Sequence, residues 1–213
     1  MNKRSAISAI NRHGILLVYP MKNKSDVLSL WSVFYPDEEM LWEWTDDGDD
    51  RVANLWHLRM KLSESTQVVY AKYFQGRATF FSREVFVALL CLMKTSEFKK
   101  KKLTHESKKI MQLLDQNSPI STKRIKKETD LKGKFFEATY MRALKVLWAK
   151  LLIVGFGEVD DGAFPSLAVG SSELLFEDLW KEALLADENA SRAFLLKKLS
   201  KQPAFLNWIQ KSL

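Results

Sequence analysis

The side chains best suited to chemistry in this 213-residue chain are cations in its middle part, and they suit the binding of a polyanion. Residues 122–129 place four cations within five positions, and residues 134–150 add more cations and a threonine. Lysine and arginine bind phosphate oxygens, and arginine can also donate two hydrogen bonds to a guanine edge. The candidate contact residues are Lys123, Arg124, Lys126, Lys127, Lys134, Thr139, Arg142 and Lys145.

The net charge of +7 is concentrated in this same part of the chain. Residues 96–150 carry 15 Lys/Arg against 6 Asp/Glu, residues 1–95 carry 12 against 11, and residues 151–213 carry 6 against 9. A basic segment within a nearly neutral chain is typical of a nucleic-acid-binding element. The alternative is a solvated lysine-rich surface, which we favour for the four lysines at 99–102 because such runs usually form linkers.

Residues 104–170 contain these cations, and their sequence pattern predicts a winged helix-turn-helix. Thr104 can cap a first helix, Ser121 can cap a second helix at 122–129, and residues 130–133 form a turn. A third helix is expected at 134–150. Two β-type stretches follow, at 151–156 and 164–169. Three helices followed by a hairpin is the order of a winged helix.

In such a domain the third helix enters the major groove. Met141, Leu144 and Leu147 recur at helical spacing and are expected to face the core. The opposite face then presents the candidate residues of this helix, with Arg142 placed to read a guanine edge and lysines placed to contact phosphates. The alternative is a winged helix that contacts protein and keeps its cations for solubility.

The expected wing carries acidic side chains at its tip. Glu158, Asp160 and Asp161 lie there without a cation, and they would repel phosphates. Binding to double-stranded DNA is therefore expected through the helices. Alternatively, the acidic tip meets a basic surface elsewhere, so a homodimer or a protein partner is conceivable through this wing or through the C-terminal helices.

The rest of the chain divides around this domain. Residues 1–95 suggest a second, winged-helix-like domain, with helices at 4–13, 28–35, 52–62 and 84–93, a strand at 15–19 and a hairpin of 67–74 with 77–81. Residues 96–103 are expected to be a basic linker, and residues 171–213 a helical C-terminal segment. The predicted fold class is α+β, mostly helical, with tandem winged helices.

Metal-binding and catalytic patterns are missing from the sequence. His13, His57 and His105 show no ligand spacing with one another or with Cys91, which reads as a small buried hydrophobe. No glycine-rich phosphate motif and no nucleophile–base arrangement is present. We therefore expect no metal, no cofactor and no catalytic residue. A single cysteine, no signal peptide and no apolar run long enough to span a bilayer predict a cytoplasmic protein without a membrane segment.

Six stretches of the chain resemble a known family. They are INRHGI (10–15), NLWHLR (54–59), VYAKYFQGRATFFS (69–82), ESKKIMQLL (106–114), FFEA with ALKVL (within 135–147) and LLIVGF (151–156). In this order the sequence resembles the winged-helix proteins related to the AlkZ/YcaQ DNA glycosylases, in particular the shorter bacterial AlkZ-related proteins. The resemblance covers roughly residues 6–180.

The resemblance implies tandem winged helices and DNA binding. The glycosylases of this family hydrolyse the bond between an alkylated base and its sugar. They use a glutamine, any residue, then glutamine or aspartate, on an N-terminal strand after a glycine. After Gly14, Leu17 and Tyr19 fall at these two positions. Leucine can neither orient water nor stabilise a developing positive charge, so the departure predicts a DNA-binding protein that is not an enzyme.

Two alternatives stay open. The first is a DNA-repair glycosylase whose catalytic residue lies elsewhere, with Glu43, Asp46 and Glu64 as candidates. The second is a winged-helix protein-interaction module that binds no DNA.

Overall fold

The computed structural model describes residues 1–22, 26–41, 50–95, 103–162 and 165–212. Residues 96–102 of the expected linker, with its four lysines, lie outside the described residues, as do Glu43 and Asp46. Helices hold 58% and strands 15% of the described residues, which confirms a mixed, mostly helical protein.

The first half of the chain follows the order helix, strand, helix, helix, strand, strand. The elements are α1 (Lys3–His13), β1 (Ile15–Leu17), α2 (Leu30–Phe34), α3 (Asp50–Ser63), β2 (Val68–Lys72) and β3 (Ala78–Ser82). A single 3-10 turn, η1 (Phe74–Gly76), joins β2 to β3, and α4 (Arg83–Thr95) follows β3. The turn needs Gly76, whose φ of 75° lies in the left-handed region. Every element predicted for this half is present within two residues of the predicted bounds.

The second half repeats the same order. Its elements are α6 (His105–Gln116), β4 (Ile120–Ser121), α7 (Thr122–Glu128), α8 (Glu137–Ala149), β5 (Ile153–Val159) and β6 (Ser166–Ser171). The predicted caps are confirmed, because the Thr104 hydroxyl accepts from the Ser107 amide and the Ser121 hydroxyl accepts from the Arg124 amide. The two-residue strand β4 is an addition that the sequence did not predict.

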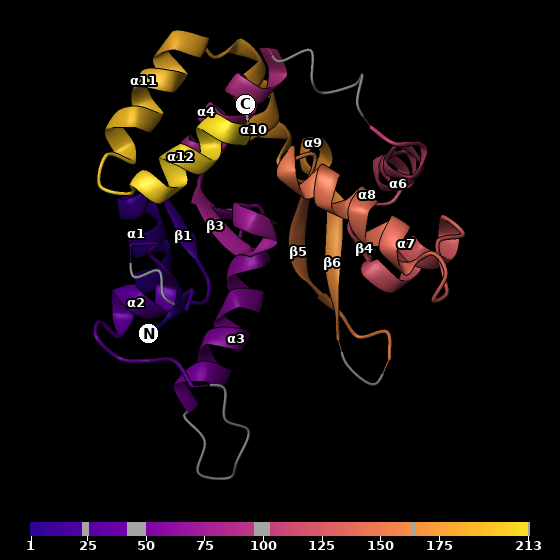
Figure 1. Cartoon of the computed structure of the whole chain (residues 1–213), viewed down its shortest axis with the longest axis horizontal. Coiled ribbons are helices and arrows are strands. Elements are labelled where there is room, and N and C mark those ends of the chain that lie inside the picture. Colours follow the sequence, from indigo (N-terminus) through magenta and orange to yellow (C-terminus); the bar gives the residue numbers. More distant parts are fainter. Residues whose placement is uncertain (23–25, 42–49, 96–102, 163–164, 213) are drawn as a thin grey trace.

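The strands of both halves form one six-stranded sheet in the order β1-β3-β2-β5-β6-β4, with neighbours antiparallel (Figure 1). The halves join at β2 and β5, where Tyr70 pairs with Gly155. A Cβ on Gly155 would lie 2.4 Å from the Tyr70 ring. Glycine is therefore required for the tyrosine to cover this junction. The two recurring units are not separate bodies but parts of one sheet.

Side chains alternate along the strands between two hydrophobic clusters. Leu16, Tyr70 and Phe80 face a cluster completed by α1, α2 and α3, whereas Leu17 and Phe81 face a larger cluster that includes α4 and α8. Helices α3 and α8 therefore contribute to different clusters, although each contacts both β2 and β5. The junction strands are thus held by the third helix of each half.

The C-terminal residues form four helices, α9 (Ser172–Leu175), α10 (Glu177–Leu185), α11 (Glu188–Lys198) and α12 (Pro203–Ser212). Helices α10 and α11 pack on α4 (Figure 1). The Phe205 ring of α12 lies 4.8 Å from the Phe74 ring. Cys91 is fully buried, as predicted, and its Sγ donates to the Ala186 carbonyl. Among the described residues, no helix combines the length and the apolar character needed to cross a membrane.

Candidate nucleic-acid interface

The candidate surface is built on α7, α8 and the turn between them. Ile125 and Leu131 anchor this segment in the core, with exposed fractions of 0% and 6%. The turn uses a positive φ of 104° at Gly133, and the Phe136 amide donates to the Gly133 carbonyl at 3.1 Å. Helix α8 therefore begins at Glu137, three residues later than predicted, and Lys134 lies in the turn that leads into it.

The buried face of α8 differs by one position from the prediction. Its buried residues are Tyr140, Ala143, Leu144, Leu147 and Trp148. Met141, expected to face the core, is 53% exposed. The reason is that Tyr140, not Met141, sits in line with Leu144 and Leu147, and one residue turns the helix by about 100°. Arg142 and Lys145 remain on the exposed side, as predicted.

Three carboxylates of residues 119–150 lie close to these cations, and each is held in an ion pair. Arg124 pairs with Glu128, Lys109 with Asp130, and Lys126 with Glu137. Lys126 Nζ reaches both Glu137 oxygens, at 2.7 and 2.8 Å, and also lies 4.8 Å from the centre of the Tyr140 ring. These pairs neutralise every acidic side chain between residues 119 and 150. A fourth carboxylate, Glu106 of α6, has its pKa lowered by hydrogen bonds from the backbone and Thr104 and also by the nearby Arg142 guanidinium.

The remaining candidate cations lie outside these ion pairs. Lys127, Lys134, Arg142 and Lys145 are exposed and form no ion pair with a described carboxylate. The Arg142 guanidinium is held by its own helix, through the Ala138 carbonyl at 3.3 Å and Thr139 Oγ1 at 3.4 Å. The structure therefore divides the predicted site into a paired group, Lys123, Arg124 and Lys126, and an unpaired group, Lys127, Lys134, Arg142 and Lys145.

Two of the three acidic residues at the expected wing tip, Asp161 and Glu158, have cationic partners within the chain. Asp161 pairs with Lys123 at 3.1 Å. Hydrogen bonds from Ser121, Ser166 and Lys123 lower the pKa of Asp161 to about 2. Glu158 pairs with Arg59 of α3. The cations that pair with these carboxylates, Lys123 and Arg59, thus belong to the same chain. The two ion pairs connect the β5–β6 hairpin to α7 and α3.

The pair of Arg59 and Glu158 is buried between the two halves, with exposed side-chain fractions of 11% and 7%. Tyr70 shares a hydrogen bond with Arg59, and Tyr19 lies in the same cluster. Burial raises the pKa of Tyr19 to about 12, so its phenol is neutral at physiological pH. The charged pair therefore occupies a largely solvent-excluded site where the halves meet.

The residues considered for glycosylase chemistry lie in different surroundings. Leu17 has no exposed surface and packs in the larger cluster, and Tyr19 is a neutral phenol in the cluster of Arg59 and Glu158. Glu64 is exposed, and its carboxylate occupies the space that a Cβ on Gly157 would need. Within the described ranges, no group of three or more His, Cys, Asp or Glu side chains is arranged to hold a metal ion.

A family model described as "AlkZ related" matches residues 2–213 of the sequence. The chain belongs to the AlkZ-related family. Comparison with curated proteins and with solved structures found no match. Membership relates this AlkZ-related protein to the AlkZ/YcaQ DNA glycosylases.

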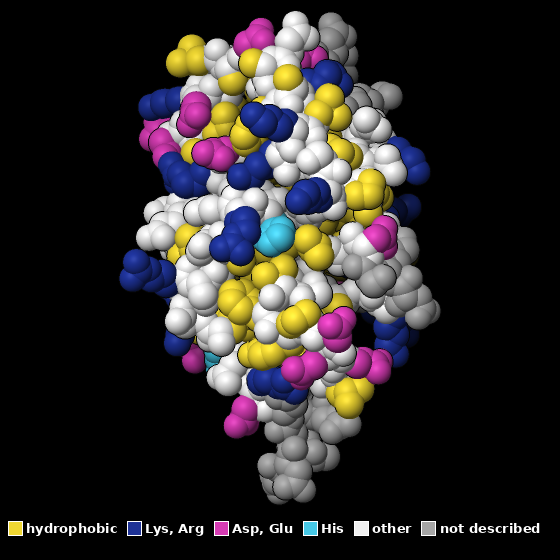
Figure 2. All heavy atoms as spheres, turned by 90° about the vertical axis from the view of Figure 1, so that its left-hand side faces the viewer, with side chains coloured by type: hydrophobic (Ala, Val, Ile, Leu, Met, Phe, Trp, Pro, Cys, Tyr) yellow, Lys and Arg dark blue, Asp and Glu magenta, His cyan; other side chains and the backbone are white. Residues whose placement is uncertain are grey.

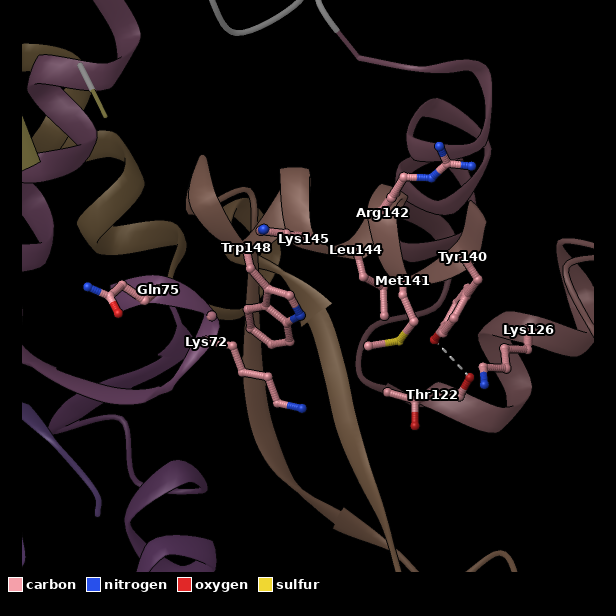
Figure 3. Close-up of a pocket in the computed structure, with 11 residues that line it drawn as sticks. Lys72, Gln75, Thr122, Lys126, Tyr140, Met141, Arg142, Leu144, Lys145 and Trp148 are labelled. Atoms are coloured by element: carbon pink, nitrogen blue, oxygen red, sulfur yellow. Dashed lines mark hydrogen bonds between the residues drawn. The ribbon is translucent and has the colours of Figure 1, made fainter. Parts of the chain in front are cut away.

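The AlkZ-related chain also has a pocket of about 480 Å³ along one side of α8 (Figure 3). Tyr140, Met141 and Trp148 line it from α8, and Lys72 and Gln75 line it from the first half. The Tyr140 hydroxyl donates to the Thr122 carbonyl at 3.1 Å and so fixes one wall. Sequence reasoning missed Lys72, because nothing in its own segment indicates that α8 lies beside it.

Proposed function

We propose that this AlkZ-related protein binds duplex DNA through α7, the following turn and the exposed face of α8, without hydrolysing glycosidic bonds. The observation that carries the proposal is a group of exposed cations on this surface that form no ion pair with a described carboxylate, among them Lys127, Lys134, Arg142 and Lys145. Uncompensated cations on one surface attract a polyanion and release its counterions on contact.

The repeated element order supports the proposal. Three helices with a short strand between the first two, followed by a hairpin, is the order of a winged helix, and both halves have it. We assign α8 as the recognition helix of the second winged helix. Its exposed Arg142 is then placed to donate to a guanine edge, and the lysines to contact the backbone.

The opposite side of the molecule is less suited to DNA. Helices α1, α2 and α11 lie on this side, on the left of Figure 1. Lys and Arg side chains occupy its middle, but acidic side chains gather above and below them (Figure 2). A duplex along this face would meet both signs of charge, which favours the α7–α8 surface.

The absence of hydrolysis is proposed from the residues at the two catalytic positions of the related glycosylases. Hydrolysis of the base–sugar bond needs a group that orients water and stabilises an oxocarbenium-like transition state. The buried Leu17 supplies neither, and the neutral phenol of Tyr19 carries no charge that could stabilise the sugar cation.

Fluorescence anisotropy with a labelled duplex over a salt series tests the proposal. We expect log affinity to fall linearly with log salt, with a slope of about −3 to −5, because each phosphate contact contributes about 0.9. A slope near zero, or no binding at low salt, contradicts DNA binding. A duplex carrying an alkylated base is expected to bind and to keep that base under single-turnover conditions. Base release faster than the protein-free rate contradicts the non-catalytic part.

A further inference from the structure

Lys72 ends β2 in the first half, yet it lines the same pocket as Lys145 and Trp148 of α8. In Figure 3 the Lys72 side chain lies below the Trp148 ring, and the Lys145 side chain lies above Trp148. Helix α8 contacts both β2 and η1, so this arrangement is part of the packing between the halves. The β2–β3 turn of the first half is thus the neighbour of the assigned recognition helix.

We propose that this turn serves as the wing for α8, with Lys72 contacting a backbone phosphate of the DNA strand that lies along the helix. The inference rests on the proposed function and extends it. One DNA surface would then combine residues of both halves, and the duplex would cover the mouth of the pocket.

The two hairpins differ in charge. Residues 65–83, which span the β2–β3 hairpin, contain Lys72, Arg77 and Arg83 and no Asp or Glu, and of these Arg83 is paired with Asp178. Residues 157–163 contain three acidic residues and no cation. Two of those three, Glu158 and Asp161, are already paired within the chain. A wing must lie along phosphates, so the basic β2–β3 turn fits this role and the acidic β5–β6 connection does not.

The surroundings of Lys72 also suit a phosphate. No carboxylate lines the pocket, and Lys72 forms no ion pair with a described acidic residue. Partial burial and the nearby positive charge of Arg59 lower the pKa of Lys72. A phosphate at the mouth of the pocket would supply the counter-charge that the protein does not.

The test compares K72Q with R77Q in the full-length protein. Both remove one exposed cation from the same hairpin, but Arg77 does not line the pocket. We expect K72Q to weaken duplex binding about 10-fold at 0.1 M salt and to reduce the salt slope by about 1, because one phosphate contact is lost. R77Q is expected to change affinity less than about 2-fold, and K72R to restore most of the wild-type affinity.

Circular dichroism melting should give the same Tm for K72Q and the wild type, since the Lys72 side chain is exposed. If the wild type binds duplex DNA and K72Q binds it equally well, the inference is overturned and the proposed function stands. An equal loss in K72Q and R77Q also overturns it, because the effect would then follow net charge and not position. If the wild type does not bind duplex DNA, the proposed function itself fails.

Discussion

Replacing Lys127, Lys134, Arg142 and Lys145 together by glutamine is expected to weaken duplex binding by at least about 100-fold at 0.1 M salt. Each phosphate contact adds about 0.9 to the salt slope, which corresponds to nearly 10-fold in affinity at this concentration. The slope of the variant should be smaller than that of the wild type by about 2 to 4. All four side chains are exposed, so the fold should be retained.

The matched control removes the same number of exposed cations outside any described ion pair, as K3Q/R12Q/K197Q/K201Q. These residues lie on α1, on α11 and directly after α11, on the side of the molecule opposite α7 and α8 (Figure 1). The control is expected to change affinity by less than about 5-fold, because charges beyond a Debye length of about 10 Å are screened. Equal losses in both variants would show that net charge, and not the α7–α8 surface, determines binding.

Lys126 has a separate role in this account. It neutralises Glu137 at the first turn of α8, at 2.7 Å, and Glu137 would otherwise face an approaching phosphate. In the proposed interface the paired cations of α7 compensate carboxylates, and the unpaired cations contact the DNA. The four-residue variant therefore keeps Lys126, since replacing it would leave the Glu137 carboxylate without its partner.

Replacing Glu158 by alanine is expected to lower the free energy of unfolding by about 3–5 kcal/mol, the usual cost of leaving one partner of a buried ion pair uncompensated. The Arg59 side chain, which is 11% exposed in the pair, would then lack its carboxylate partner between the two halves of the sheet. Urea denaturation at constant pH measures the effect. The double variant R59M/E158L is expected to recover most of the loss, because apolar groups of similar volume often replace a buried pair at little cost.

The control is E177A, which breaks an ion pair with Lys181 whose side chains are 64% and 69% exposed. Exposed pairs contribute little, so its effect should stay below about 1 kcal/mol. If E158A is as mild as E177A, the pair does not hold the halves together and the buried cluster is more hydrated than described.

Local features of the fold could be predicted from the sequence because they depend on nearby residues. The caps at Thr104 and Ser121 and the turn at Gly76 each follow from the chemistry of a few neighbouring residues. The two-residue strand β4 could not be predicted, since it pairs with β6, a distant segment of the chain, and two residues are too few to show a periodic pattern.

The candidate site was predictable only in part, because its charge state depends on contacts across the chain. The cations of α7 and α8 are visible in the sequence. Their division into paired and unpaired groups is not, because Lys123 meets Asp161 only after the hairpin folds back. Lys72 beside α8 and Tyr70 over Gly155 likewise arise from the joining of the two halves. Met141 was misassigned because it differs from Tyr140 by a single helical position.

Hydrogen–deuterium exchange with and without a saturating duplex tests the central claim most directly, because it locates the bound DNA. Protection is expected on α7, the turn and α8, with further protection in the β2–β3 turn. Helices α10 and α11 should exchange equally in both samples. Protection confined to α1 and α11, on the face shown in Figure 2, would contradict the account.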